Sequence, residues 1–545
     1  MANRVAIILT VMCVGFHALG AQAERPQRIA LVPQPLKMER RSCDFLLTRG
    51  MTILVERDSA AAAEIGRQLA ERLNRGTGLG LIVTPAAGPA AVRHGIRLTT
   101  QQANAALGAE GYTLEVSPRG VVISATAAPG LFYGTQTLLQ LLPPAVFRAA
   151  DGEPTANWTV PAVRIEDRPR FPWRMLLLDV ARHFFSKEEV KNFIDLMAEY
   201  KLNTLQLHLT DGEGWRLEIK RHPRLTQVGG WRNGIGYGLD PKLGTAYGPD
   251  GRYGGFYTQR DMRELIAYAK ARYVTLVPEI EMPGHCGAAL SVYPQYSCAG
   301  SGGPYCIGNE GTFAFLEEVL SEVIDVFPSK YIHVGGDEVD KTNWKKCPKC
   351  QARLRQEGLK DVNELQSYFI RRIEKFINSR HRTLVGWDEI LEGGVAPNAV
   401  VMSWRGIEGG IAAARAGHDV VMTPVSHCYF DYYQAQSGEP KAIGGFLPLK
   451  TVYAFEPIPA ALNADEAKHV LGGGGNLWTE FVPNYAHVQY MVYPRACAMA
   501  ESLWTEPGQK NWDDFTARLG PHLERLRAQA VHYREPRPTD SQPGK

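Results

Sequence analysis

From residue 174 onward, short and almost continuous apolar runs alternate with longer segments of helical periodicity. Eight such runs occur, at Met175–Val180, Thr204–Leu209, Val274–Pro278, Tyr331–Val334, Thr383–Trp387, Val400–Trp404, Val420–Thr423 and Gly475–Trp478. Amphipathic helices are predicted at Lys187–Tyr200, Gln259–Arg272, Thr312–Phe327 and Val362–Ser379. Strands that are apolar on both faces and alternate with helices are typical of a parallel sheet covered on both sides. Eight of them predict a (β/α)8 barrel, somewhat distorted because the helix between the fifth and sixth runs is barely visible.

The segment before this pattern mixes strand and helix signals and predicts a smaller α+β domain. Strands are expected at Met51–Val55 and Val121–Ala125, and helices at Ala61–Asn74 and Gly130–Leu142. A chain of 545 residues exceeds one ordinary hydrophobic core, which also favours two domains. We therefore expect an α+β domain over residues 24–165, the barrel over 166–510, a C-terminal helix over 511–534 and a disordered polar tail over 535–545.

The N-terminus has the pattern of a secretory signal peptide. Arg4 is the only charge before Glu24, residues 5–20 are largely apolar, and Ala21-Gln-Ala23 is a small-residue cleavage site. We expect removal of residues 1–23 and export to the periplasm or the medium, or to the lysosome in a eukaryotic host. No later run is long and apolar enough to span a bilayer. The net charge of +3 is spread over interspersed acids and bases, so nucleic acid is not an expected partner, and the oligomeric state is left open.

Eight cysteines follow this segment: Cys43, Cys286, Cys298, Cys306, Cys347, Cys350, Cys428 and Cys497. Export would permit disulfides, and Cys298 and Cys306 are the best local pair because they bracket a loop rich in glycine and serine. Cys347 and Cys350 have the spacing of a metal knuckle. No second Cys/His pair of similar spacing is evident, so a disulfide or free thiols are favoured over structural zinc.

Polar or aromatic residues follow every one of the eight apolar runs. In chain order they are Asp179, Arg182 and His183; His208 and Asp211; Glu279, Glu281 and His285; Asp337 and Glu338; Trp387, Asp388 and Glu389; Trp404 and Arg405; Tyr429 and Asp431; and Trp478 and Glu480. A single end of this kind is explained by a helix cap or a buried ion pair. Eight together indicate a ligand pocket at the C-terminal ends of the strands, where barrel enzymes have their active sites.

The residue types at these ends favour a sugar as the ligand. Indole faces pack on the apolar C–H face of a pyranose, and carboxylates and guanidinium groups hydrogen-bond to hydroxyls. For any single tryptophan, a place in the core is an equally good interpretation. A phosphate loop and a G-x-S-x-G nucleophile elbow are both absent from the sequence. A metal site built on His208 and His285 lacks the H-x-x-x-H spacing, so we expect neither metal nor cofactor in this pocket.

Asp337 and Glu338 are the centre of the predicted chemistry. A buried run leads through Gly335 and Gly336 into this acid pair, which leaves room for a ligand against the backbone. A lone acid pair is more often a surface loop cap, but two acids in one cleft should not ionise independently. Consecutive strand residues point to opposite faces, so the pair is poorly placed to act as nucleophile and acid on one bond. One hypothesis is that a 2-acetamido group of the substrate is the nucleophile, with Glu338 as acid/base and Asp337 orienting the acetamide.

At these residues the chain resembles glycoside hydrolase family 20, the β-N-acetylhexosaminidases, over nearly its whole mature length. His333-Val-Gly-Gly-Asp337-Glu338 matches the H-x-G-G-D-E signature. Asp179-Val-Ala-Arg182-His183 resembles D-x-S-R-H, with Ala181 for Ser. Leu207–Arg216 resembles H-L-T-D-D-Q-G-W-R, with Gly212 and Glu213 departing from it. Pro278–His285 resembles P-E-I-D-M-P-G-H, with Glu281 for Asp.

The resemblance implies a role for each site residue. Glu338 would be the acid/base, supported by a relay of His285 and Asp211. Asp337 would orient the acetamide, and Tyr429 would hydrogen-bond its carbonyl. Arg182 would hold the 3- and 4-hydroxyls, Asp431 and Glu480 would bind distal hydroxyls, and the pocket walls would be Trp387, Trp404 and Trp478. The implied activity is exo-acting, retaining hydrolysis of terminal β-linked GlcNAc or GalNAc from oligosaccharides or glycoconjugates, without a metal.

Two alternatives stay open at this point. One is a lacto-N-biosidase-like enzyme that releases disaccharides, which needs an open pocket beyond the first sugar. The other is a carbohydrate-binding protein on a catalytically silent barrel. The intact Asp337, Glu338 and Tyr429 argue against it, because binding alone does not need an adjacent acid pair.

Overall fold

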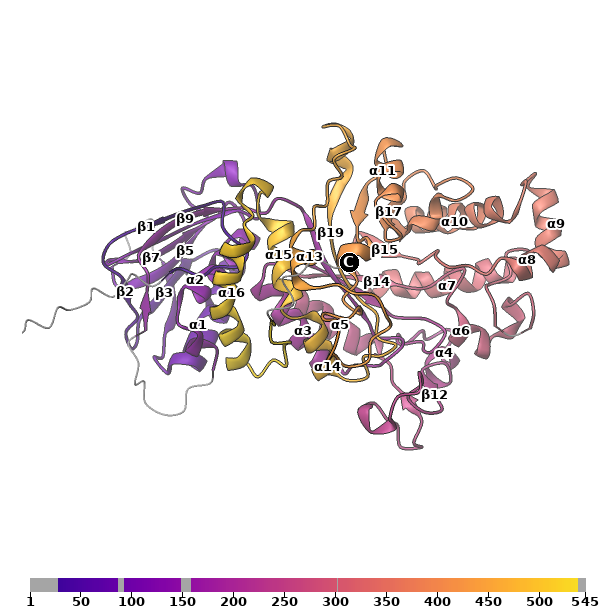
Figure 1. The fold of residues 1–545 in the computed structure, drawn as a ribbon, viewed down its shortest axis with the longest axis horizontal. Helices are drawn as coiled ribbons and strands as arrows, with labels where there is room; N and C mark the ends of the chain where they lie inside the picture. The colour runs from indigo at the N-terminus through magenta and orange to yellow at the C-terminus, as the bar shows by residue number, and fades with distance from the viewer. Residues whose placement is uncertain (1–27, 87–92, 149–157, 301, 538–545) are drawn as a thin grey trace, which may run out of the picture.

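The computed structural model describes residues 28–86, 93–148, 158–300 and 302–537. It contains a closed, eight-stranded parallel barrel preceded by a smaller α+β domain, which confirms the predicted fold class. Figure 1 shows the two domains side by side along the longest axis of the molecule. The signal peptide predicted for residues 1–23 and residues 538–545 of the predicted tail lie outside the described residues.

The N-terminal domain is a seven-stranded mixed sheet with two helices. Its strands, in the order in which they pair, are β1 (Lys37–Arg40), β9 (Val163–Asp167), β6 (Tyr112–Ser117), β7 (Gly120–Ser124), β5 (Gly95–Thr99), β3 (Thr52–Glu56) and β4 (Ile82–Ala86). Helices α1 (Ala60–Thr77) and α2 (Ala128–Leu141) pack on this sheet. Ser59 caps the start of α1, and Gly78 ends it in the left-handed conformation. Because β9 belongs to this sheet, the domain extends to Asp167 rather than to residue 165.

The barrel strands are buried along almost their whole length. They are β10 (Trp173–Asp179), β11 (Thr204–His208), β14 (Thr275–Glu279), β15 (Tyr331–His333), β16 (Thr383–Trp387), β17 (Val400–Ser403), β18 (Val420–Met422) and β19 (Val470–Leu477). The connection between β16 and β17 holds only the short 3-10 helix η5 (Asp388–Leu391), as its weak sequence signal indicated. Side chains fill the barrel interior, among them Trp173, Met175 and Leu177 from β10.

The last barrel strand begins earlier than expected. We predicted it from Gly475, but β19 starts at Val470 and includes four consecutive glycines. A Cβ on Gly472 would overlap the carbonyl oxygen of Trp173 and lie 3.0 Å from its carbonyl carbon, so β10 approaches too closely for any side chain. Glycines are rare in strand interiors, and the sequence therefore reads as a loop where close strand approach in fact requires them.

Helices surround the barrel near their predicted positions. The four expected ones are α3 (Lys187–Glu199), α5 (Gln259–Lys270), α7 (Glu310–Val326) and α10 (Val362–Ser379); the others of more than six residues are α9 (Pro348–Gln356), α11 (Glu408–Arg415), α14 (Tyr485–Val492), α15 (Arg495–Trp504) and α16 (Trp512–Ala528). A capping box between Ser186 and Glu189 starts α3. The C-terminal helix α16 ends at Ala528 rather than at residue 534. Within the described chain, no helix is both long and apolar enough to cross a membrane.

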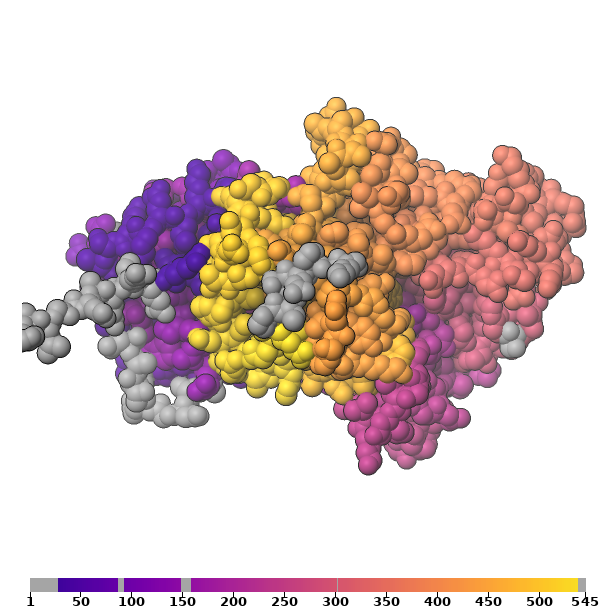
Figure 2. Space-filling model, viewed as in Figure 1, coloured from indigo at the N-terminus to yellow at the C-terminus, as the bar shows by residue number. Residues whose placement is uncertain are grey.

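A buried ion pair joins the two domains. Lys201, which follows α3, donates to Asp167 at the end of β9 over 2.9 Å, and the indole N–H of Trp504 donates to the same carboxylate over 2.8 Å. Both Lys201 and Asp167 are fully buried. Figure 2 shows α16, in yellow, lying against the N-terminal domain and beside the barrel. The N-terminal domain is thus packed firmly on the barrel, on the side away from α8 (Thr342–Lys346) and α9.

Candidate active site

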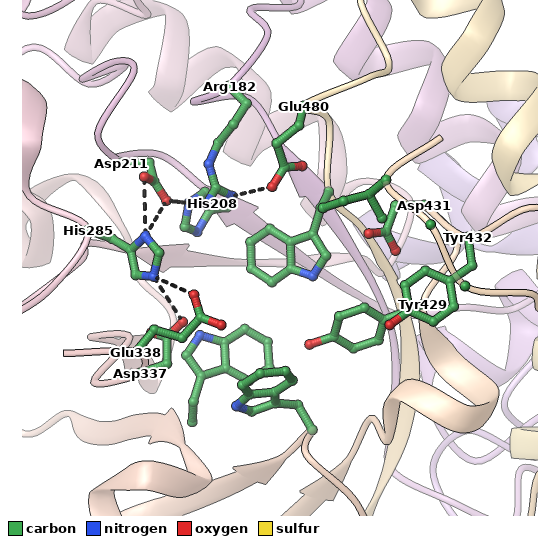
Figure 3. A pocket seen from close by; sticks show the side chains of 16 residues that line it. Arg182, His208, Asp211, His285, Asp337, Glu338, Tyr429, Asp431, Tyr432 and Glu480 are labelled. Carbon is green, nitrogen blue, oxygen red and sulfur yellow. Dashed lines mark hydrogen bonds and ion pairs between the residues drawn. The ribbon is translucent and has the colours of Figure 1, made fainter. Parts of the chain in front are cut away.

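The C-terminal ends of the barrel strands surround a cavity of about 340 Å³. All eleven predicted site residues line it: Arg182, Asp211, His285, Asp337, Glu338, Trp387, Trp404, Tyr429, Asp431, Trp478 and Glu480. Figure 3 shows Asp211, His285, Asp337 and Glu338 together on one side of the cavity, and Tyr429 and Tyr432 on the other with Asp431 beside them. This volume lies at the small end of the range for ligand pockets, about 300–1,000 Å³, and suits a single sugar ring.

The acid pair reaches the cavity through a sharp turn. Strand β15 ends at His333, and Gly335 and Gly336 follow with φ of +67° and +94°. Our expectation that Asp337 and Glu338 behave as consecutive strand residues on opposite faces is wrong, because the glycine turn ends the strand before them. Their carboxylates approach the same atom: Oδ2 of Asp337 lies 3.6 Å and Oε2 of Glu338 lies 3.4 Å from Nε2 of His285. The two acids therefore stand on one side of the cavity rather than flanking it.

Backbone strain is concentrated at two of these residues. Glu338 has φ +48° and His285 has φ +45°, in the left-handed region that side-chain-bearing residues seldom adopt. Such strained positions persist only where the surrounding structure fixes them, and they cluster at functional sites. The turn thus holds Glu338 in one defined orientation toward His285.

His285 links Glu338 to a buried anion. Its Nδ1 lies 3.3 Å from Oδ1 of Asp211, and its Nε2 faces Glu338. Burial disfavours the imidazolium, but hydrogen bonds to Asp211 and Glu338 raise the pKa of His285 to about 11. The same hydrogen bond from His285 lowers the pKa of Glu338. At neutral pH the pair therefore holds one proton, which lies on the imidazole and is shared with the carboxylate.

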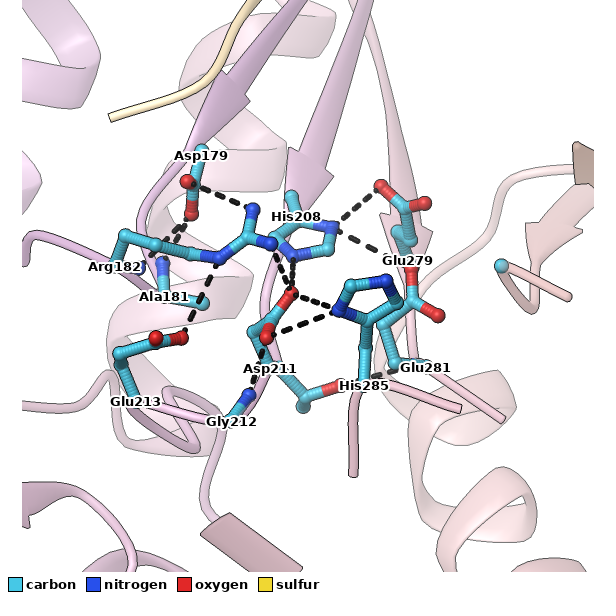
Figure 4. Close-up of polar contacts among 12 residues, drawn as sticks. Asp179, Ala181, Arg182, His208, Asp211, Gly212, Glu213, Glu279, Glu281 and His285 are labelled. Carbon is cyan, nitrogen blue, oxygen red and sulfur yellow. Dashed lines mark hydrogen bonds and ion pairs between the residues drawn. The ribbon is translucent and has the colours of Figure 1, made fainter. Parts of the chain in front are cut away.

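Asp211 is the anion at the centre of this network, drawn in Figure 4. Arg182 contacts its Oδ2 at 2.7 Å, and Nε2 of His208 lies 3.0 Å from the same oxygen. Burial alone would raise the pKa of Asp211, but the charge of Arg182 and the two histidine hydrogen bonds hold it well below its usual range. Glu213, one of the two departures from the family pattern, lies 3.5 Å from Nε of Arg182 and adds a further carboxylate to this cluster.

Glu279 anchors the floor of the site, a role that the sequence did not reveal. It lies 2.9 Å from Nδ1 of His208 and 3.0 Å from Nδ1 of His333, and it accepts a hydrogen bond from the indole N–H of Trp387 over 2.9 Å. Together with Glu281, His208 and Glu279 could offer three atoms to a metal ion. Glu279 already accepts hydrogen bonds from Trp387 and Gln206, so we assign it to positioning the tryptophan and histidine side chains.

Aromatic rings form the opposite wall. Trp404 stacks on Tyr429 with ring centres 6.0 Å apart, and Trp387 packs against Trp478 with centres 5.8 Å apart. Four residues that we had not predicted complete the rim of the cavity: Tyr432, Ile443, Gly444 and Gly445. They follow the seventh strand in a long connection that carries no motif, so sequence patterns gave no signal for them.

Several carboxylate oxygens in the cavity are buried without a hydrogen-bond partner. They are Oδ1 of Asp337, Oδ1 of Asp431 and Oε2 of Glu480. Burial raises the pKa of Asp337, and burial with the nearby charge of Glu480 raises the pKa of Asp431 well above its usual range. Buried acceptors in folded proteins are nearly always satisfied, so these three oxygens mark where a ligand would supply N–H or O–H donors.

Comparisons with known proteins agree with this geometry. The family model described as glycosyl hydrolase family 20, catalytic domain, matches residues 171–507, and that for domain 2 of the same family matches residues 28–168. A beta-hexosaminidase of Porphyromonas gingivalis is 41% identical over 99% of this chain and 68% of the relative.

Two solved structures extend this comparison. A GH20 exo β-N-acetylglucosaminidase from Vibrio harveyi, in complex with N-acetylglucosamine, is 35% identical with a TM-score of 0.81, covering 93% of this chain and 78% of that one. A GH20 β-N-acetylhexosaminidase from Streptomyces coelicolor is 33% identical with a TM-score of 0.80, covering 93% and 98%. The chain therefore belongs to glycosyl hydrolase family 20.

Proposed function

We propose that this chain is an exo-acting β-N-acetylhexosaminidase that removes terminal β-linked GlcNAc or GalNAc by a retaining, substrate-assisted mechanism. Three buried, unpartnered carboxylate oxygens around a cavity of one-sugar size are the observation that carries this proposal. A 2-acetamido sugar offers one N–H and several hydroxyl donors to these acceptors. The names of the related enzymes, which are β-hexosaminidases and β-N-acetylglucosaminidases, support the same substrate class.

In the first step, the acetamide oxygen of the substrate attacks the anomeric carbon. The bond from that carbon to the leaving oxygen breaks, and Glu338 transfers its proton to the departing group. Asp337, buried beside the site, accepts the acetamide N–H and balances the positive charge of the oxazolinium ion that forms. Tyr429 donates to the acetamide oxygen from the aromatic wall. Because Asp337 and Glu338 lie on the same side of the cavity, they do not flank a bound sugar as a nucleophile and an acid would.

In the second step, water attacks the same carbon and opens the oxazolinium ring. Glu338 takes a proton from this water, and the product leaves with the original β configuration. Two inversions at one carbon give overall retention.

The His285–Glu338 pair supplies the proton for the first step. The Glu338 side chain is 58% exposed, and a bound sugar would shield it from solvent. Desolvation disfavours the carboxylate, so the shared proton moves from His285 onto Glu338 when the substrate is in place. Asp211 keeps His285 protonated in the free enzyme and thus ready for this transfer.

The remaining residues hold the sugar. Asp431 and Glu480 each have a carboxylate oxygen without a hydrogen-bond partner, which would accept a hydrogen bond from a distal hydroxyl. Arg182, beside Glu480, would hold the 3- and 4-hydroxyls. Trp387, Trp404 and Trp478 provide apolar faces for the pyranose and the acetamide methyl group.

Hydrolysis of nitrophenyl β-GlcNAc tests this proposal. We expect turnover by the wild type and a loss of at least about 10²-fold in Glu338→Gln, the contribution expected of general acid catalysis. Turnover by Glu338→Gln at the wild-type rate would overturn the acid/base assignment. On a chito-oligosaccharide we expect monosaccharide release alone. Disaccharide release would favour the lacto-N-biosidase alternative, and tight binding without turnover would favour a silent binding protein.

We also propose that the protein is exported after removal of residues 1–23. The support is the order of features in that segment, in which a positive charge is followed by an apolar stretch and then by a cleavage site of small residues. N-terminal sequencing of protein recovered outside the cytoplasm should begin at Glu24, and a mature chain that retains Met1 would contradict export.

A further inference from the structure

Four cysteines that lie far apart in the sequence converge near one end of the barrel. Cys298 and Cys306 belong to the loop between η4 (Pro294–Tyr296) and α7, and Cys347 and Cys350 lie at the start of α9. All four sulfur atoms lie within 4.8 Å of one another. Figure 1 places α8 and α9 at the end of the molecule opposite the N-terminal domain, so this cluster is separate from the domain interface.

The distances between the sulfurs do not select disulfide pairs. The sulfur of Cys350 lies 3.5 Å from that of Cys298 and 3.7 Å from that of Cys306, and Cys306 is also 3.7 Å from Cys347. A disulfide requires about 2.05 Å. The eight described cysteines are all free thiols, so the local pair that we favoured, Cys298 with Cys306, is not formed. Cys306 and Cys350 instead each have two sulfur neighbours within 3.7 Å.

These distances match a tetrahedron of thiolates around zinc. Zn–S bonds of about 2.3 Å in tetrahedral geometry place the sulfurs about 3.8 Å apart. We propose that Cys298, Cys306, Cys347 and Cys350 bind one Zn²⁺ as a structural tetrathiolate site. Four protein ligands fill the coordination shell, which is the arrangement of structural rather than catalytic zinc.

The surroundings suit such a site. Cys306, Cys347 and Cys350 are buried, and Cys298 is partly exposed and leaves a path for the ion. Gly308 packs so closely that a Cβ there would overlap the backbone of Lys349 and Cys350, which fixes the Cys306 loop onto the knuckle. Four thiolates and one Zn²⁺ carry a net charge of −2. The start of α9 and the lysines next to the knuckle in the sequence, Lys345, Lys346 and Lys349, carry charge of the opposite sign.

The zinc would join the two loops that carry His285 and Glu338. The β14–α7 loop contains His285 and both Cys298 and Cys306, and the β15–α10 segment contains Glu338 and both Cys347 and Cys350. One hydrogen bond already connects them, from the Trp344 indole N–H to the Tyr305 carbonyl over 2.9 Å. Within the first loop, the Tyr305 N–H donates in turn to the Pro283 carbonyl over 2.9 Å, close to His285 in the sequence. The metal would therefore help hold the His285–Glu338 pair, without touching substrate itself.

Metal analysis of the full chain, purified without reductant or chelator, tests the proposal. We expect about one zinc per chain in the wild type and almost none in Cys350→Ser. The control Cys43→Ser, at an exposed cysteine outside the cluster, should keep its zinc, as should Cys286→Ser, which changes a neighbouring buried thiol of the same loop. Wild-type protein without zinc would overturn the proposal. This holds if its four cysteines react freely with a thiol reagent in denaturant, and equally if peptide mapping shows them joined in disulfides.

Cobalt substitution keeps the proposal falsifiable if Cys350→Ser does not fold. The wild type, after exchange of its metal for Co²⁺, should show thiolate-to-cobalt charge-transfer bands and the intense visible bands of tetrahedral cobalt. Weak visible bands of octahedral cobalt, without charge transfer, would contradict a tetrathiolate site. This readout does not depend on activity, so it stands or falls separately from the proposed glycosidase function.

Discussion

Gly335 offers the sharpest structural test of the acid-pair turn. It has φ +67°, and a Cβ there would lie 2.5 Å from Oε1 of Glu281 and closer still to its Oε2. Ordinary contact begins at 3.4 Å, and Oε2 sets the displacement because it is the nearer oxygen, so the carboxylate or the turn must move by more than about 1 Å. Glu281 is fully buried and cannot swing into solvent. The displacement must therefore be taken up by the turn that positions Asp337 and Glu338.

The expected result of Gly335→Ala is a large loss of kcat. A shift of about 1 Å in catalytic groups can cost about 10²-fold, and the left-handed backbone adds roughly 1–2 kcal/mol of destabilisation. Gly80→Ala separates the two effects, because Gly80 has the same φ of +67° and a Cβ there would have no neighbouring atom within 4 Å. It should lose a similar amount of stability from the backbone but keep full activity.

Steady-state kinetics on nitrophenyl β-GlcNAc, with thermal unfolding of both variants, measures these effects together. A kcat for Gly335→Ala within about threefold of wild type, an energy difference below 1 kcal/mol, would refute the reasoning. It would show that the turn tolerates a side chain and that the glycine is not what positions the acids.

Three further predictions follow from single contacts. Asp211→Asn removes the anion that stabilises the protonated His285, so the proton of His285 should leave at lower pH. Loss of a charge-assisted hydrogen bond of about 1.5–3 kcal/mol should shift the alkaline limb of the kcat/KM profile down by about 1–2 pH units. An unmoved limb would show that Asp211 does not act on His285. Tyr429→Phe should lower kcat by about 10²–10³-fold by removing one donor to the acetamide oxygen, whereas an effect confined to KM would assign the hydroxyl to binding. Lys201→Met leaves Asp167 buried without its counter-ion and should lower the free energy of unfolding by about 3–5 kcal/mol, measured as a lower thermal midpoint. The control Lys37→Met, at an exposed pair, should lower it by no more than about 1 kcal/mol. Equal effects of the two variants would contradict the importance of burial.

The sequence was sufficient to predict the barrel and the membership of its pocket, and topology explains why. Side chains that follow parallel strands must meet at one end of a closed barrel, so Arg182 on the first strand end and Glu480 on the last could be assigned to one site without a structure. The motif around Asp337 and Glu338 then indicated which chemistry that site performs.

Contacts that depend on three-dimensional detail could not be predicted in this way. Strand periodicity placed Asp337 and Glu338 on opposite faces, because it does not anticipate that two glycines with positive φ end the strand at His333. Glu279 looked like one acid among many, since its three partners come from different strands. The cysteine cluster was invisible for the same reason. Its ligands come from two loops that only the folded barrel brings together.

The identity of the nucleophile is the central claim, and a series of substrates with modified acyl groups tests it most directly. Nitrophenyl β-glycosides bearing 2-acetamido, fluoroacetamido, difluoroacetamido and trifluoroacetamido groups differ little in size, but their carbonyl oxygens become progressively weaker nucleophiles. If the acetamide attacks the anomeric carbon, kcat should fall steeply and continuously along this series. A kcat that stays constant would mean that a group of the protein is the nucleophile, and it would contradict the mechanism assigned to Asp337 and Glu338.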